Sequence, residues 1–483
     1  MKRTLLFLLL GIISFNSFSQ LSADEKQILK IVERNMPGSW KLLEESVNIN
    51  SGTFNTEGVK KVGAIYSKQL EALGFKVEWV SLPDSLKRAG HLVATKTGTK
   101  GKRLFLIGHL DTVFEPDMPA NPFKQISDST ATGQGVNDMK GGDVVIISAL
   151  KALHQQGLLK DASITVYMTG DEENAGHPHE VSREDFINRA KQHDIALAFE
   201  TATSLNIVAT ARRGASGWEL VTEAKQGHSS GVFAGGGYGA IYEAARIINS
   251  FRETLGNQQF LTFNPGMFIG GSEVNYQKSA QKGEISGKTN IISPKTVVIG
   301  DLRFITESQK DSARETMKQV VSQNLPGTKA SITFSDGIPS MPPTEGNQAL
   351  AKVVSDISES MGMGPVLPGN PGSRGAGDIS YIAKYLDCLD GLGASGRGAH
   401  APGETINTKE YETLIGRTAL LLYRLSRWHP GGKMSSPLVK NNQNTPKCPV
   451  FSSFSPFFAS FPAKTAKICH SQFTPSDLNP DKI

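Results

Sequence analysis

The chain has 483 residues, of which 38% are hydrophobic and 20% are charged, a composition typical of a globular protein with two or three domains. Its formal net charge is only +5, and its lysines and arginines are scattered, which argues against a nucleic-acid-binding protein. Three cysteines, Cys388, Cys448 and Cys469, are too few for a disulfide framework in a chain of this length.

The N-terminal segment has the pattern of a secretory signal peptide. Lys2 and Arg3 precede an apolar run over residues 5–15, and small residues follow at Ser17 and Ser19. We expect cleavage near residue 20, so that residues 1–20 are the signal peptide, export to the periplasm or out of the cell, and no stable membrane insertion afterwards. An uncleaved membrane anchor is disfavoured because the apolar run is shorter than the ~20 residues of a membrane-spanning helix.

After the leader, residues 21–82 show helical spacing of apolar positions, and strand-like and helical runs then alternate. Strands are predicted at residues 91–98, 103–109, 163–170 and 195–200, with a helix over residues 141–157. This alternation predicts an α/β domain with a mainly parallel sheet. In such a sheet, ligands bind beyond the carboxyl ends of the strands.

From Arg213 the predicted elements follow the order strand, helix, strand, strand, helix, strand, which is one β-α-β-β-α-β unit. We therefore predict a ferredoxin-like α+β domain over residues 213–338, inserted into a larger α/β domain formed by residues 21–212 and 339–429. Residues 430–483 are rich in Pro, Ser, Asn, Lys and Phe without helical or strand periodicity, and they predict a mostly unstructured tail. Docking of the tail phenylalanines on a surface is the alternative.

Acidic and imidazole side chains gather where the predicted strands and their loops end. They are His109 and Asp111, Asp138 in a glycine-rich turn, Asp171, Glu172 and Glu173, Glu200, and His400. Like charges brought together in one cleft repel each other unless cations neutralise them, and a pair of divalent cations would do so. A dinuclear zinc site needs nitrogen and oxygen ligands, a bridging carboxylate, and a further carboxylate that takes a proton from water. Glu172 and Glu173 are adjacent, so their side chains point in different directions. One of them can therefore bind metal while the other transfers the proton.

In their order and spacing, these motifs resemble the zinc peptidases of the M20 family, and most of all its glutamate carboxypeptidases. The resemblance extends from about residue 21 to residue 428. It implies a cofactor of two Zn²⁺ ions per subunit. His109 and Glu200 would bind one zinc, Glu173 and His400 the other, and Asp138 would bridge both.

The same resemblance assigns the catalytic residues. It implies that Asp111 orients His109 and that Glu172 is the general base. The inserted domain corresponds to the dimerisation or lid domain of the family, so a homodimer is implied. His228 in the stretch KQGHSSG would then cross the dimer interface and stabilise the oxyanion of the tetrahedral intermediate.

The substrate-binding residues that the resemblance implies are Asn290, Arg303, Arg374 and Gly375. Arg303 could instead be a salt-bridged strand residue, and Arg374 lies in the glycine-rich stretch GSRGAGDIS, near the expected position of the terminal carboxylate of the substrate. Glutamate carboxypeptidases carry an arginine after the last lid strand that reads a glutamate side chain. The corresponding stretch here, FSDGIPSM, has none, so glutamate specificity is not implied.

These patterns predict an exported zinc-dependent exopeptidase that hydrolyses the amide bond of an N-acyl or N-peptidyl C-terminal amino acid. Its partner would be a small peptide or N-acyl amino acid rather than a nucleic acid. An N-acyl-amino-acid deacetylase or aminoacylase would use the same metal centre with a different pocket. A catalytically silent metal-binding module is the alternative of another class, and Glu172 argues against it because metal binding alone needs no general base.

Overall fold

The computed structural model describes residues 20–428. Most of the predicted signal peptide and the predicted tail over residues 430–483, with Cys448 and Cys469, lie outside the described residues. Within the described part, no helix combines the length and the apolar character needed to cross a membrane. Cys388 is a buried free thiol.

The larger α/β part is built on a six-stranded sheet in the order β1-β2-β6-β3-β7-β18. Its strands are β1 (Lys76–Val80), β2 (His91–Lys96), β3 (Lys100–His109), β6 (Ala162–Thr169), β7 (Ile195–Ala198) and β18 (Asp387–Leu389). The strands β6, β3, β7 and β18 run parallel to one another, whereas β1 and β2 are antiparallel additions at one edge. The predicted mainly parallel sheet is thereby confirmed.

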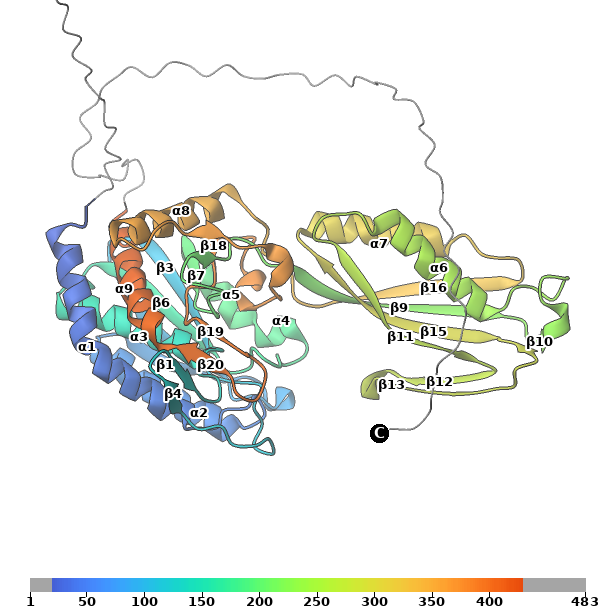
Figure 1. Ribbon diagram of the computed structural model, residues 1–483, viewed down its shortest axis with the longest axis horizontal. Helices are drawn as coiled ribbons and strands as arrows, with labels where there is room; N and C mark the ends of the chain where they lie inside the picture. The colour runs from blue at the N-terminus through green and yellow to red at the C-terminus, as the bar shows by residue number, and fades with distance from the viewer. Residues whose placement is uncertain (1–19, 429–483) are drawn as a thin grey trace, which may run out of the picture. The chain divides into compact units, whose positions relative to one another are not determined.

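Helices cover both faces of this sheet, as expected when parallel strands are joined by crossover helices. On one face α1 (Ala23–Val47), α3 (Lys140–Gln155) and α9 (Thr408–Leu425) pack against one another, as Figure 1 shows. The same core takes side chains from α2 (Thr56–Ala72) and α8 (Glu345–Ser360). Phe186 of α5 (Glu184–Ala190) belongs to a separate core with Phe105 and Tyr167, on the other face.

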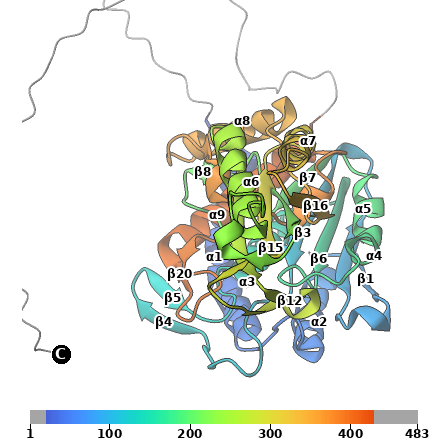
Figure 2. The ribbon, with the colours of Figure 1, turned by 90° about the vertical axis from the view of Figure 1, so that its right-hand side faces the viewer.

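A second sheet lies between β8 and α8 in the chain and has the order β11-β15-β9-β16, with all its pairs antiparallel. Its strands are β9 (Gly214–Ala224), β11 (Thr262–Gly271), β15 (Lys295–Phe304) and β16 (Thr328–Asp336). The helices α6 (Ala240–Leu255) and α7 (Glu307–Val321) lie side by side and bury Trp218 and Leu220 of the sheet (Figure 2). This is the predicted ferredoxin-like order of elements, while the domain boundaries at 212/213 and 338/339 stay predictions.

Helices were predicted over residues 21–82, but β1 lies within this range, so the prediction is wrong for Lys76–Val80. One hairpin of the inserted unit was not predicted from the sequence either. It consists of β12 (Glu273–Gln277) and β13 (Lys282–Ser286), and Lys278 at its turn forms an ion pair of 3.2 Å with Glu219 of β9. Val274 and Tyr276 alternate with polar residues in the first strand, but the second strand, KGEIS, has a single large apolar residue, so the sequence indicates a strand pair only weakly.

The remaining elements are short and shape the loops. They are β4 (Lys124–Ser127), β5 (Thr130–Thr132), α4 (His179–Ser182), β8 (Ile207–Val208), β10 (Gly227–His228), β14 (Ile291–Ile292), β17 (Leu367–Pro368), β19 (Gly396–Arg397) and β20 (Thr405–Asn407). Pairing of β20 with β5 matters most, because it brings the loop that carries His400 next to the turn that carries Asp138.

Candidate metal centre

The carboxyl ends of the central parallel strands bring together three groups suited to bind a cation. His109 is the last residue of β3, Glu200 follows β7, and Asp138 lies in the turn before α3. His109 Nε2 lies 3.3 Å from Asp138 Oδ1 and 3.9 Å from Glu200 Oε1. One ligand atom from each of these residues lies within 4.8 Å of the other two, so the set can hold one metal ion.

A second set shares Asp138 with the first. His400 Nε2 lies 3.1 Å from Asp138 Oδ2 and 3.1 Å from Glu173 Oε2. Asp138 therefore presents Oδ1 to one set and Oδ2 to the other, which is the arrangement of a bridging carboxylate. Glu173 Oε1 is buried without a hydrogen-bond partner among the described residues, so this oxygen is free to bind a cation. Imidazole and carboxylate donors of this kind fit a pair of divalent ions.

Asp111 fixes the orientation of this centre. His109 Nδ1 donates to the backbone oxygen of Asp111 at 2.9 Å, which turns Nε2 toward the other ligands. The Asp111 carboxylate accepts hydrogen bonds from the backbone N–H groups of Glu172 and Glu173 and from Thr53 Oγ1, at 3.0, 3.1 and 2.6 Å. One buried aspartate thus positions an imidazole of the first set, Glu173 of the second set, and the adjacent Glu172.

Glu172 belongs to neither set of ligands. Its carboxylate faces Gly377, because a Cβ atom built on Gly377 would lie 3.5 Å from Glu172 Oε1. Burial, and then the charge of Glu200, raise the pKa of the Glu172 carboxyl well above its usual value. A carboxylate beside the ligands, with a raised pKa and no metal to bind, is suited to accept a proton.

Neighbouring carboxylates raise the pKa values of the two imidazoles in this cluster. Hydrogen bonds to Asp138 and Glu173 raise the pKa of His400 to about 11. Burial opposes the charged form of His109, yet the hydrogen bond to Asp138 and the charge of Glu200 raise its pKa well above normal. Burial, and then the charge of Asp138, raise the pKa of Glu200 to about 7. The acids of this site therefore require positive partners, and bound cations would replace the imidazole protons.

The structure identifies Glu404 as a positioning residue that was not predicted from the sequence. Its buried carboxylate accepts hydrogen bonds from the backbone N–H groups of Gly135, Asn137 and Asp138 at 3.0, 2.7 and 2.8 Å. Glu404 lies four residues after His400, so it joins the loop of one ligand to the turn of the bridging ligand. Glu404 binds backbone N–H groups rather than a side chain, so no motif in the sequence indicates its partners.

Replacing Glu404 by Gln is expected to lower metal affinity about 10- to 100-fold, because an amide NH₂ would face a backbone N–H donor and loosen the Asp138 turn. Titration of the metal-free protein with Zn²⁺ measures the affinity. Glu410→Gln is the matched control, since Glu410 accepts its hydrogen bond from Ser395 Oγ at 2.6 Å and touches no ligand. Equal affinities for Glu404→Gln and the wild type would contradict this role.

Two arginines form a positive group beside the centre, and only Arg374 was predicted from the sequence. Arg212 is 6% exposed, its Nε lies 3.0 Å from Asp390 Oδ2, and its Nη1 has no hydrogen-bond partner among the described residues. Arg374 Nη2 lies 3.9 Å from the same oxygen, and Arg374 Nη1 donates to Thr201 O at 2.7 Å. A Cβ atom on Gly377 would overlap the Arg212 guanidinium. Two guanidinium groups share one carboxylate here, and within the described part of the chain Arg212 keeps N–H donors without a hydrogen-bond partner next to Glu172.

Other predicted residues lie apart from the ligands. The strand β10, which carries His228, pairs with β14, and Ser229 N donates to Asn290 O at 2.9 Å, so His228 and Asn290 are neighbours. Arg303 Nε is 3.0 Å from Asp301 Oδ2 on the same strand. Within residues 20–428, no hydrogen bond or ion pair joins these three residues to the metal ligands. A Cβ atom built on Gly375 would have no neighbouring atom within 4 Å, so open space lies beside this residue.

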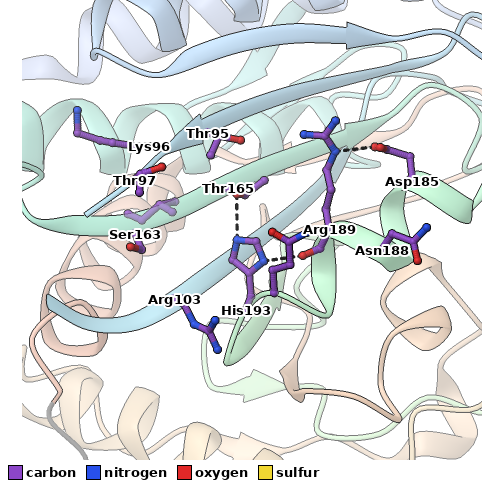
Figure 3. A pocket seen from close by; sticks show the side chains of 12 residues that line it. Thr95, Lys96, Thr97, Arg103, Ser163, Thr165, Asp185, Asn188, Arg189 and His193 are labelled. Carbon is purple, nitrogen blue, oxygen red and sulfur yellow. Dashed lines mark hydrogen bonds and ion pairs between the residues drawn. The ribbon is translucent and has the colours of Figure 1, made fainter. Parts of the chain in front are cut away.

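A groove of about 650 Å³ lies at the ends of β3 and β6 that are opposite to the metal ligands (Figure 3). Its arginines and Asp185 are ion-paired within the protein, and Lys96 Nζ donates to Gly74 O at 3.2 Å. Arg103 Nη2 is 2.7 Å from Asp194 Oδ1, and Arg189 Nε is 2.8 Å from Asp185 Oδ2. His193 bonds Thr165 Oγ1 at 3.0 Å. Because these partners already satisfy one another, the groove is not a candidate for the chemistry of the metal centre.

The α/β fold with this cluster at its strand ends defines a metal-dependent peptidase or amide hydrolase. The chain belongs to peptidase family M20/M25/M40, whose model matches residues 105–424.

Three similar proteins illustrate the relationship. Carboxypeptidase G2 of Pseudomonas sp. (strain RS-16) is 28% identical over 369 residues, which cover 76% of this chain and 83% of that protein. A succinyl-diaminopimelate desuccinylase of Polynucleobacter necessarius is 26% identical over 299 residues, covering 59% of this chain and 74% of that protein. The solved structure of aminopeptidase PepT from Bacillus cereus shares the fold, with a TM-score of 0.61 at 18% identity over 83% of this chain and 98% of that one.

Proposed function

We propose that this protein is an exported, zinc-dependent carboxypeptidase that removes a C-terminal amino acid from an N-acyl or N-peptidyl group. The observation that carries the proposal is the geometry of Asp138, whose two carboxylate oxygens each face a separate set of ligands. Glu172 stands beside both sets without belonging to either. A bridging carboxylate next to a free carboxylate is what hydrolysis at a two-metal centre requires.

Zinc is the proposed metal, since two imidazoles and three carboxylates make up the ligand sets. When bound, such ions polarise the scissile carbonyl and make water nucleophilic near neutral pH. The residues of the chain supply the remaining functions. Glu172 takes the proton from water and passes it to the leaving amine, while Asp111 holds Glu172 in place through the 3.0 Å bond to its backbone N–H. His228 is proposed to stabilise the oxyanion from a second copy of the chain.

Arg212 and Arg374 support a substrate that ends in a free carboxylate. Both flank Asp390, and the spare donors of Arg212 face Glu172 and Gly377. Guanidinium groups with N–H donors that lack a partner favour a carboxylate, which they can bind through two N–H groups. We propose that the C-terminal carboxylate of the substrate binds here, together with Gly375. This assignment favours the carboxypeptidase over a hydrolase that accepts uncharged amides.

Replacing Arg212 by Lys is expected to lower kcat/KM about 10- to 100-fold for a substrate with a free carboxylate. The ammonium group of lysine cannot form the bidentate interaction of a guanidinium with this carboxylate. The corresponding carboxamide substrate should lose much less. Steady-state kinetics on both substrates measure the ratio. Arg213→Lys is the control, since Arg213 donates to Thr262 Oγ1 and Gly372 O instead, at 3.0 Å each. Equal losses on acid and amide would show that Arg212 does not read the carboxylate.

The proposed activity is tested by measuring metal content and then hydrolysis of a panel of N-acyl and peptidyl amino acids, with Glu172→Gln as the inactive control. Release of C-terminal amino acids from peptides supports the carboxypeptidase. A strong preference for short acyl groups would instead support the N-acyl-amino-acid deacetylase, which needs the same ligands. A wild-type protein that binds two metal ions and hydrolyses nothing in the panel would support the silent metal-binding module.

Export and dimer formation are further parts of the proposal. Lys2, Arg3 and the apolar run after them support a signal peptide. Ile241, Tyr242 and Phe268 are 41, 53 and 43% exposed on α6 and the edge strand β11, and an apolar patch at a sheet edge suits a second copy of the chain. Cell fractionation and light scattering test the two points. Retention in the cytoplasm or a monomer at micromolar concentration would contradict them.

A further inference from the structure

Arg183, between α4 and α5, is fully buried and binds two aspartates. Its Nη1 donates to Asp171 Oδ1 at 2.6 Å, and its Nε donates to Asp378 Oδ1 at 2.8 Å. Its Nη2 also donates to the backbone oxygen of Asp171 at 3.2 Å. A rigid guanidinium can hold two carboxylates in a fixed mutual position, which a single ammonium cannot do.

The two aspartates belong to segments that face each other across the proposed active site. Asp171 directly precedes Glu172, and Asp378 directly follows Gly377. Gly377 is the residue whose Cβ position lies 3.5 Å from Glu172 Oε1. Arg183 therefore connects the backbone that carries the proposed general base to the glycine-rich loop that lies against its carboxylate.

Further hydrogen bonds give every carboxylate oxygen of this network a donor. Asp378 Oδ2 accepts from Thr169 Oγ1 at 2.7 Å, and Asp171 Oδ2 accepts from Gly176 N at 2.9 Å. His91 adds no positive charge, because its Nδ1 accepts from Gly170 N at 3.2 Å and burial lowers its pKa. Arg183 is thus the cation on which both buried aspartates depend.

We propose that Arg183 is a positioning residue for hydrolysis, which sets the separation between Glu172 and the loop over residues 375–377. This inference rests on the proposed function and adds a residue that touches neither substrate nor metal ligand. The ligands His109, Asp138 and His400 are held by contacts that do not involve Arg183. Loss of the guanidinium should therefore misplace the base while leaving the metal centre loaded.

The variant Arg183→Lys tests this inference, with Arg189→Lys as the matched control. Arg189 lies on α5 and also binds two carboxylates, Asp185 and Glu78, at 2.8 Å each, but it lines the groove in Figure 3. For Arg183→Lys we expect kcat per metal-loaded enzyme to fall about 10- to 100-fold, as for a misplaced catalytic group, with KM changed less than about threefold. Arg189→Lys should match the wild type in kcat and KM.

The outcomes separate the possible failures. Equal kcat values for Arg183→Lys and Arg189→Lys, or a lower kcat explained entirely by lost metal, would overturn the inference. If Arg183→Lys does not fold, Thr169→Val decides, because it removes only the second bond to Asp378. Its kcat should fall about 3- to 10-fold, the value of one hydrogen bond, and an unchanged kcat would overturn the inference. A wild type that hydrolyses no substrate would instead refute the proposed function.

Discussion

Replacing Glu172 by Gln is expected to lower kcat about 1,000-fold, within the range of general acid–base catalysis, while the metal content stays unchanged. Gln has the shape of Glu and keeps the backbone bond from Glu172 N to Asp111 Oδ1, but its amide cannot accept the proton of water. Because Glu172 lies outside both ligand sets, the loss should appear in kcat and not in metal binding. Steady-state kinetics together with elemental analysis of the purified variant measure both quantities.

Two comparisons sharpen this experiment. Glu173→Gln changes the adjacent residue, whose Oε2 lies 3.1 Å from His400, and it should lose metal as well as activity. Glu180→Gln changes an exposed glutamate of α4 and should behave as the wild type. If Glu172→Gln kept more than a tenth of the wild-type kcat, proton transfer would have to be assigned to another residue.

Removal of the metal by a chelator is expected to abolish hydrolysis, and Asp138→Asn is expected to prevent its recovery. Asp138 serves both ligand sets with separate oxygens, so an amide at this position weakens both. Zn²⁺ added back at about 100 times its Kd should stabilise the wild type by about 2.7 kcal/mol for each site that it fills, because it binds only the folded chain. Thermal unfolding with and without Zn²⁺ measures this stabilisation. Asp138→Asn should show little of it.

The pH dependence of metal binding follows from the imidazoles. Without metal, the neighbouring carboxylates raise the pKa of His400 to about 11 and raise that of His109 as well, so protons compete with metal ions for both rings. A metal ion binds only the neutral ring, and each displaced proton should make affinity rise about 10-fold per pH unit. Calorimetry in buffers of different ionisation enthalpy counts the released protons.

The control for both measurements is Asp161→Asn, which changes a surface aspartate paired with Lys100 and should leave zinc binding as in the wild type. Full recovery of activity by Asp138→Asn, or zinc affinity independent of pH between 6 and 8, would contradict the assignment of Asp138 and the imidazoles as ligands.

Asp111 shows why short motifs at strand ends can be recognised in the sequence. In the apolar run before His109, Leu104, Leu106 and Ile107 form a buried strand, and the polar residues after it must lie at its carboxyl end. Because Asp111 is only two residues from His109, the chain itself keeps the two together at this edge of the sheet. The same holds for Glu172 and Glu173 after β6 and for Glu200 after β7.

Glu404, Arg212 and Arg183 could not be found in this way. Glu404 binds backbone N–H groups some 270 residues away in the chain, at 3.0 Å for Gly135, and every residue offers such a donor. Arg212 lies between predicted elements, and its importance depends on Asp390 and Gly377. Arg183 acts through two aspartates from distant segments. Long-range partners of this kind leave no periodic pattern in the sequence.

The amino-acid order is sufficient to predict the α/β class, the inserted unit and the candidate ligands. Apolar periodicity and strand ends are properties of neighbouring residues, so they can be recognised in the sequence. The tertiary structure determines which of these side chains come together. It places one oxygen of Asp138 toward His109 and the other toward His400, and it leaves Glu172 outside both ligand sets. Those pairings arise from the packing of segments hundreds of residues apart, and packing is a property of the whole chain.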